Sequence, residues 1–281
     1  MIGLASASAT GFAADPELPA RDELLDDKAM ARHLGAAMGT DVAGVTLRRV
    51  KYRIGDSLRV LYRVDYGSRR HDLVAVRAFG ASRPPSRLRQ SAQATVGLDS
   101  LGAAGWVFPA DRKLAGLRRF VTDAEARAEA AGTPIDEVEL VAYAPEKHAT
   151  LRCVRNGRTV GYAKLYASDA HRRSVAVHEW MWGRTHEIGL DVPRVLAVDD
   201  AMGLVMLSPV NGLQLAVTTD CRSWHALGVA TGRLHGIEPA GPLSPHARLT
   251  PDRLRSAAAL IGAARPDVAD RAAALLDGLV A

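Results

Sequence analysis

Residues 148–166 read HATLRCVRNGRTVGYAKLY, and this segment decides the fold that the sequence predicts. Apolar and polar residues alternate on both sides of Asn156 and Gly157, as in strands, where successive side chains point to opposite faces. An Asn-Gly pair between two such runs is a strong hairpin signal, because a type I′ turn needs positive φ at both central residues. The segment therefore predicts a β-hairpin whose second strand carries Lys164 on the same face as Tyr162.

The hairpin is flanked by further strands and helices. In chain order the flanking patterns are a strand at 135–144, a helix at about 168–187, strands at 192–200 and 204–210, and helices at 222–236, 250–262 and 265–281. The helix at 222–236 gathers Trp224, Leu227 and Leu234 on one face, so we expect this helix to be buried.

A similar order of elements occurs earlier in the chain. Residues 16–38 have the pattern of an amphipathic helix, and residues 44–79 have that of three strands. Tyr52 and the strands after it align with the second β-rich segment so that Arg77 falls opposite Lys164. Two interpretations stay open, an internal duplication and the alternation that any two hairpins share.

Together these patterns predict an α+β chain. Its expected parts are an N-terminal helical segment (1–41), a β-rich unit with a linker (42–133), a second β-rich unit (134–212) and a helical region (213–281). The linker, TDAEARAEAAGT at 122–133, is polar and rich in alanine, which is typical of a linker or a short exposed helix.

Composition excludes several classes of protein. The chain has 281 residues, 48% of them hydrophobic, which is enough to bury a sizeable core. Its net charge of +5 is spread between acidic and apolar residues, so we expect no nucleic-acid partner. No window resembles a signal peptide or reaches the roughly 18–20 apolar residues of a membrane span. The two cysteines are too few for a disulfide framework, which favours a cytoplasmic location.

The order of three strands, a helix, two strands and further helices is similar to the amino-terminal lobe of kinases. In kinases a strand lysine offsets the charge of the nucleotide phosphates, and a helix glutamate holds that lysine. Lys164 and Glu179 are the candidates here, and we expect them to form an ion pair. The alternative is a surface lysine and a solvated glutamate.

A wider resemblance adds to this pattern. The runs HEWMWGRTHEIGLDVPRVLAVDDAMGLVMLSPVNGLQL (178–215) and LGVATGRLHGIEP (227–239) resemble the aminoglycoside phosphotransferase and choline kinase-like family, including its maltokinase-like members. The matching segments cover roughly residues 137–240. The resemblance implies that Lys164 contacts the phosphates of ATP and that Glu179 orients Lys164. It also implies that the backbone from Met206 through Ser208 to Val210 meets the adenine.

The chain departs from the family pattern in three places. APEKHATLR stands where a glycine-rich loop is expected, and Tyr162 occupies a position that usually holds alanine. No His-Gly-Asp loop follows His235, so the family's catalytic aspartate and Mg²⁺ ligands have no counterpart and no catalytic residue is assigned. We therefore expect an incomplete chain that transfers no phosphate by itself.

The leading hypothesis is an ATP-dependent phosphotransferase that acts on a small hydroxylated acceptor such as a sugar or aminoglycoside. A non-catalytic kinase-like module that binds a nucleotide or a protein is the first alternative, and an arginine-rich nucleic-acid-binding protein is the second. Leu275, Leu276 and Leu279 should form an uncovered apolar face on the last helix, which would lower solubility.

Overall fold

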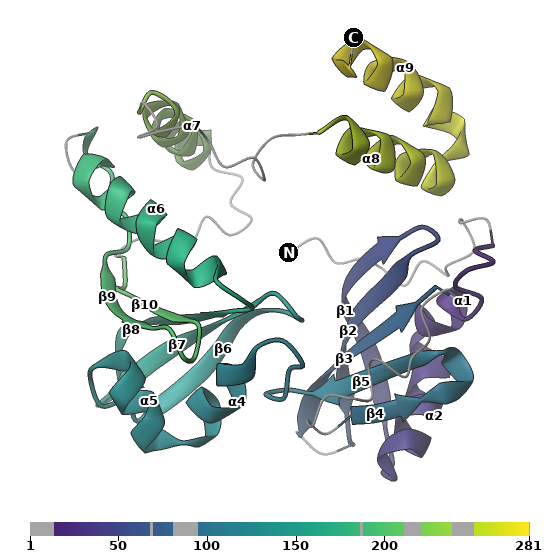
Figure 1. Ribbon diagram of the computed structural model, residues 1–281, viewed down its shortest axis with the longest axis horizontal. Helices are drawn as coiled ribbons and strands as arrows, with labels where there is room; N and C mark the ends of the chain where they lie inside the picture. The colour runs from purple at the N-terminus through teal and green to yellow at the C-terminus, as the bar shows by residue number, and fades with distance from the viewer. Residues whose placement is uncertain are drawn as a thin grey trace. The chain divides into compact units, whose positions relative to one another are not determined.

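The computed structural model describes residues 14–67, 70–80, 95–185, 188–210, 221–237 and 250–280. The elements before Phe108 are α1 (Arg21–Leu24), α2 (Asp27–Met38), β1 (Gly44–Arg53), β2 (Ser57–Asp65), β3 (His71–Phe79), β4 (Thr95–Leu98), η1 (Asp99–Leu101) and β5 (Ala103–Val107). The next group is α4 (Ala115–Thr122), α5 (Ala124–Ala131), β6 (Glu137–Ala144), β7 (His148–Arg155), β8 (Arg158–Tyr166), α6 (Ala170–Thr185), β9 (Val195–Asp199) and β10 (Leu204–Leu207). The last elements are α7 (Cys221–His235), α8 (Pro251–Ala264), η4 (Pro266–Val268) and α9 (Ala269–Val280) (Figure 1).

The chain is α+β and contains two antiparallel five-stranded sheets with the same strand order. The order is β1-β2-β3-β5-β4 in the first sheet and β6-β7-β8-β10-β9 in the second. In both sheets the strand that comes fifth in the sequence lies between the third and the fourth strands. The predicted similarity of the two β-rich segments is therefore confirmed at the level of strand order.

The strand registers match as well. In the first sheet, Tyr52 on β1 and Ala78 on β3 pair with the same residue of β2. Arg77 lies one residue before Ala78. In the second sheet, Tyr143 on β6 and Leu165 on β8 pair with the same residue of β7. Lys164 lies one residue before Leu165. Arg77 and Lys164 thus occupy equivalent positions, as the sequence alignment predicted.

In the first unit a buried aspartate ties the start of the unit to the β1–β2 turn. Tyr52 donates from its hydroxyl to Oδ2 of Asp15 at 2.5 Å, and the backbone N–H of Gly55 donates to the same oxygen at 2.9 Å. Oδ1 of Asp15 accepts from the backbone N–H of Glu17 at 3.1 Å. Gly55 has φ of 67°, a left-handed conformation that favours glycine.

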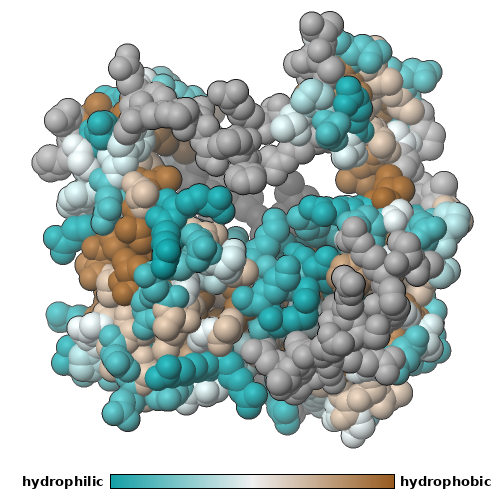
Figure 2. Space-filling view, viewed as in Figure 1, coloured by the Kyte–Doolittle hydropathy of each residue, from teal (hydrophilic) through white to brown (hydrophobic). Residues whose placement is uncertain are grey.

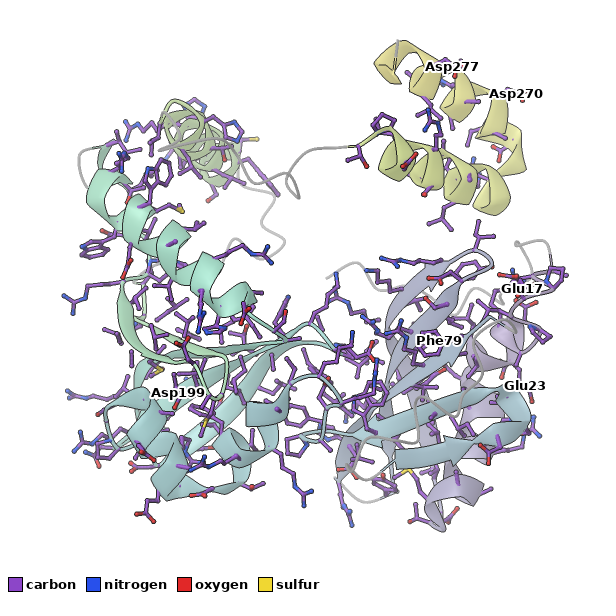
Figure 3. All side chains as sticks on the ribbon, in the orientation of Figure 1. Glu17, Glu23, Phe79, Asp199, Asp270 and Asp277 are labelled. Carbon is purple, nitrogen blue, oxygen red and sulfur yellow. The ribbon has the colours of Figure 1, made fainter. Side chains whose placement is uncertain are left out.

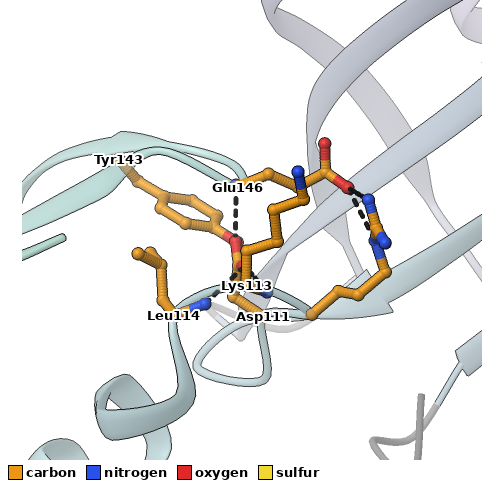
Figure 4. Close-up of polar contacts among 6 residues, drawn as sticks. Asp111, Lys113, Leu114, Tyr143 and Glu146 are labelled. Atoms are coloured by element: carbon orange, nitrogen blue, oxygen red, sulfur yellow. Dashed lines mark hydrogen bonds and ion pairs between the residues drawn. The ribbon is translucent and has the colours of Figure 1, made fainter. Parts of the chain in front are cut away.

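The second unit repeats this arrangement (Figure 4). Oδ2 of Asp111 accepts from the Tyr143 hydroxyl at 2.7 Å and from the backbone N–H of Glu146 at 2.8 Å. Oδ1 accepts from the backbone N–H of Lys113 at 2.7 Å and of Leu114 at 3.1 Å. Glu146 has φ of 60° at the position equivalent to Gly55. We call each arrangement an aspartate staple.

The staples set the boundaries of the duplication at residues 15–107 and 111–207, called repeat 1 and repeat 2 below. The helices before each sheet match too, since Asp26 caps α2 and Asp123 caps α5 by accepting from the N–H three residues on. The described helices of the segment 1–41 begin repeat 1. The stretch at 122–133, predicted as a linker or a short exposed helix, contains the short helix α5, which buries Ala126 and Ala130 rather than exposing them.

Compact units divide where the repeats do. The first unit contains the chain up to Val107 together with α8 and α9, and the second contains the chain from Phe108 through α7. In repeat 1, α2 packs Met30 and Leu34 against the sheet face that carries Tyr62. Tyr62 is fully buried and donates its hydroxyl to the backbone carbonyl of Leu24, so its one polar group is satisfied.

Of the helices after the second sheet, α7 is less covered than the sequence predicted, whereas α9 is exposed as expected. No described residue of α7 is buried, and Trp224 is 52% exposed, so the prediction of a buried helix was wrong. Amphipathicity shows which face can pack, but burial also needs an element placed against that face. Leu275 on α9 is 64% exposed, in line with the expected apolar face, while the Leu279 side chain lies outside the described residues.

Apolar side chains also gather on the surface of repeat 2, over α6 and β9 (Figure 2). They include Val177 and Trp182 on α6 and Leu196 and Val198 on β9, all exposed. None of the helices in the described segments is long and apolar enough to cross a bilayer.

Candidate functional site

Lys164 lies near the middle of β8, between β7 and β10. It is opposite Thr150 on β7 and Val205 on β10, and its side chain is half-buried. The Lys164 Nζ atom lies 5.1 Å from the centroid of the Tyr166 ring, within the range of a cation–π interaction. The Tyr166 hydroxyl in turn donates to Oγ of Ser174 on α6 at 2.7 Å. Lys164 is therefore on the face of the sheet that meets α6.

Glu179 is not the partner of Lys164. Within the described segments no ion pair joins these two residues, and Glu179 is exposed. The reason is helical phase, since residues four apart share a face of a helix while adjacent residues point about 100° apart. Ser174 contacts the sheet, so His178 points the same way and Glu179 points to solvent.

His178 takes the position that was expected for the acid. Burial, and then the nearby positive charge of Lys164, lower the pKa of His178 below its usual value. The backbone carbonyl of Pro193 accepts a hydrogen bond from the ring, and the buried Nδ1 atom has no partner among the described residues. His178 is thus no counter-charge for Lys164, and no ion pair involves the lysine in the described segments, an arrangement that favours an anionic ligand.

The predicted adenine-contacting segment divides into parts with different surroundings. Met206 is fully buried within β10, and its side chain points away from the Lys164 face because its neighbour Val205 lies opposite Lys164. Ser208 is tied to Arg194, because its N–H donates to the Arg194 carbonyl at 2.8 Å and its Oγ accepts from the Arg194 N–H at 2.8 Å. Val210 is 42% exposed at the end of a described segment.

A second set of contacts fixes the start of α6. His171 is buried, with Nδ1 3.2 Å from the carbonyl of Ser168 and Nε2 2.6 Å from Oδ1 of Asp200 in the β9–β10 turn. Arg172 also donates to this carboxylate, and these hydrogen bonds hold the pKa of Asp200 below its usual range. The helix that carries His178 is thus anchored to the sheet at one end.

Two features of the site were missed by sequence reasoning. His178 could have been found by fixing the phase of α6 on the residues that must contact β8 rather than on the position of an acid. The aspartate staples have a short signal, Asp-x-x-Leu before each helical segment, at 15–18 and 111–114. The turns Asp-Ser-Leu-Gly at 99–102 and Asp-Ala-Met-Gly at 200–203 mark the start of the last strand of each repeat in the same way.

Comparison with models of known protein families, with curated proteins and with solved structures finds no match to this chain. In the segments that the structure describes, no group of three or more His, Cys, Asp or Glu side chains is placed to hold a metal ion.

Proposed function

We propose that repeat 2 is a kinase-like nucleotide-binding unit and that the chain belongs to an ATP-dependent phosphotransferase that acts on a small hydroxylated acceptor. The observation that carries the proposal is the position of Lys164 in the element order β6-β7-β8-α6-β9-β10. The lysine lies on the third strand, on the face that meets the helix inserted between the third and fourth strands.

The electrostatics of this position support an anionic ligand. Lys164 is half-buried, and the residue of α6 beside it is a histidine rather than a carboxylate. The pKa of this histidine is lowered, so the helix supplies no negative charge to neutralise the ammonium. In phosphoryl transfer the protein acts mainly by positioning the phosphates and offsetting their charge. Lys164 would supply one such charge. Mg²⁺ would need further ligands, and the described residues hold no group of three or more His, Cys, Asp or Glu side chains placed for a metal ion.

A non-catalytic module that binds nucleotide is the second candidate. The same alternative includes a module that binds a protein instead, and Ser208 favours that form, because its backbone N–H is bonded to Arg194 rather than free for an adenine ring. Nucleotide turnover separates the two candidates, because a binding module retains ATP without acceptor-dependent loss of the γ-phosphate.

The proposal is tested by titrating the full chain with ATP by calorimetry, beside the variants Lys164→Met and Arg77→Met. The substitution at 164 should weaken ATP binding roughly tenfold or more, since a charge-assisted contact contributes about 1.5–3 kcal/mol. The substitution at 77 removes a cation from the equivalent strand position of repeat 1 and should leave ATP affinity unchanged. Equal affinity of all three proteins would disprove the assignment of Lys164.

A further inference from the structure

A cavity of about 660 Å³ lies in repeat 2, bounded by the β6–β7 turn, the end of β8 and the start of α6. Three cationic side chains from separate parts of the chain line it. Lys113 comes from the loop before α4, Lys147 from the β6–β7 turn and Arg173 from the first turn of α6. His148 and Tyr166 complete much of its wall.

The positive charge of this cavity is not balanced by its own lining. Glu146 is the one carboxylate among the lining residues, and Arg112 donates to it from Nε at 2.7 Å. Within the part of the chain that the structure describes, no ion pair involves Lys113, Lys147 or Arg173. All three residues are exposed, and the convergence of three cations on one cavity favours a negatively charged occupant.

Repeat 1 provides an internal control for Lys113. The equivalent residue is Glu17, because each is two residues after its staple aspartate and donates its N–H to that carboxylate (Figure 3 labels Glu17). The fold therefore accepts either sign of charge at this position.

The same holds for Lys147. Its N–H donates to the carbonyl of Ala144 at 2.9 Å, and the N–H of Asp56 donates to the carbonyl of Arg53 at 3.1 Å in the equivalent turn. The carbonyl oxygens of Lys147 and Asp56 also accept equivalent bonds, at 2.9 Å and 2.8 Å, from the residue that follows the third strand. Two lysines of repeat 2 thus replace two acids of repeat 1 on a shared backbone, so packing does not explain the lysines.

We infer that this cavity binds a small anion that carries a phosphate group. A phosphate monoester is close to a dianion at neutral pH, and its oxygens accept several charge-assisted hydrogen bonds at once. A carboxylate would neutralise only one of the three cations. Lys164 does not line the cavity, but Tyr166 does and it contacts Lys164, so the experiment must distinguish the cavity from the proposed nucleotide site.

The test is calorimetric titration of the full chain with inorganic phosphate and with a small phosphate monoester, in buffers matched in ionic strength with chloride. The variants Lys113→Glu and Lys147→Asp introduce the residues that repeat 1 carries, and Arg173→Gln removes the third charge. Each should raise the dissociation constant for phosphate roughly tenfold. Circular dichroism checks that each variant is folded.

Two matched controls make the result specific. Arg155→Gln and Arg158→Gln remove the same charge at the β7–β8 turn, the end of those strands away from the cavity, and should leave phosphate binding unchanged. Lys164→Met distinguishes the cavity from the proposed nucleotide site, because phosphate held at Lys164 would be lost in that variant and retained in the three cavity variants. The inference is overturned if phosphate does not bind at about 10 mM, if the control variants at 155 and 158 weaken binding as much as the cavity variants, or if Lys164→Met alone weakens it while the cavity variants bind as the wild type does.

Discussion

Repeat 1 and repeat 2 share a backbone plan but differ in where they place charge. Both have the same strand order and an aspartate staple, and both turn tightly before the last strand at a glycine with positive φ, Gly102 or Gly203. What the repeats share is therefore structural. What differs between them, on a backbone that tolerates both choices, is where function is best sought.

The sheet faces show this difference clearly. In repeat 1 a single register row carries Lys51, Arg59 and Arg77 on neighbouring strands. In repeat 2 the corresponding row reads Ala142, Thr150 and Lys164. Like charges directly opposite one another destabilise a sheet unless other groups compensate them. The single cation of repeat 2, surrounded by neutral neighbours, suits a more selective role than the triple row of repeat 1.

The largest predicted effect is the loss of stability when the aspartate of either staple is replaced. Asp111 is fully buried and accepts four hydrogen bonds, so Asp111→Ala should destabilise the chain by about 3–5 kcal/mol. Asp15→Ala should cost less, about 2–3 kcal/mol, because the Asp15 contacts are only partly buried. Urea denaturation followed by circular dichroism measures both. Effects below about 1 kcal/mol would mean that the staples do not stabilise their repeats, and equal effects would contradict the difference expected from burial.

A second prediction concerns the helix before each sheet. A Cβ added at Gly116 would lie 2.6 Å from backbone atoms of Met202, although the equivalent residue in repeat 1 is Ala20. Gly116→Ala should therefore destabilise repeat 2 by about 1–3 kcal/mol through overpacking. Gly183→Ala on α6 is the control. Among the described residues beyond its own turn of helix, no atom lies within 4 Å of its added Cβ, and the substitution should stabilise the chain by about 0.5–1 kcal/mol. Thermal melts of both variants should shift in opposite directions.

A third prediction concerns a buried position that carries a polar residue in repeat 2 and an apolar residue in repeat 1. Arg127 donates to the carbonyls of Phe120, Val121 and Ile135, whereas the equivalent residue of repeat 1 is the fully buried Met30. Arg127→Met should cost about 1–3 kcal/mol, because it leaves these carbonyls without a donor. Urea denaturation measures the change. A neutral substitution would show that repeat 2 can pack this position as repeat 1 does.

The smallest predicted effect depends on pH. The pKa of Asp200 is lower in the folded chain than its usual value of 3.8, because Arg172 and His171 donate to it. The unfolded chain therefore binds more protons at low pH, so the stability from this carboxylate is present above about pH 4 and is lost as the pH falls further. Asp200→Asn should remove that dependence. The stability difference between wild type and variant should shrink from pH 7 to pH 3, and a constant difference would contradict the assignment.

Sequence reasoning succeeded where local chemistry determines local structure. Alternation and the Asn156-Gly157 turn predicted the central hairpin, and the register later placed Arg77 and Lys164 at equivalent positions. It failed where the outcome depends on three-dimensional partners. The choice between Glu179 and His178 depends on a helical phase that only packing against β8 fixes.

The burial of α7 depends on elements that the amphipathic pattern cannot supply. The staples were missed for a related reason. Their aspartates and tyrosines are separated by more than thirty residues in sequence, and no periodic pattern connects residues at such a distance.

The staples also bear on how the chain folds as it is synthesised. Asp15 contacts residues 37 and 40 positions later, and Asp111 contacts residues 32 and 35 positions later. Each contact needs only the helices and the first hairpin of its own repeat, before the last two strands are made. Contacts of short sequence separation form early, and domains fold in the order in which they leave the ribosome. Each half can therefore close its first hairpin onto its own aspartate while the strands that finish its sheet are still being translated.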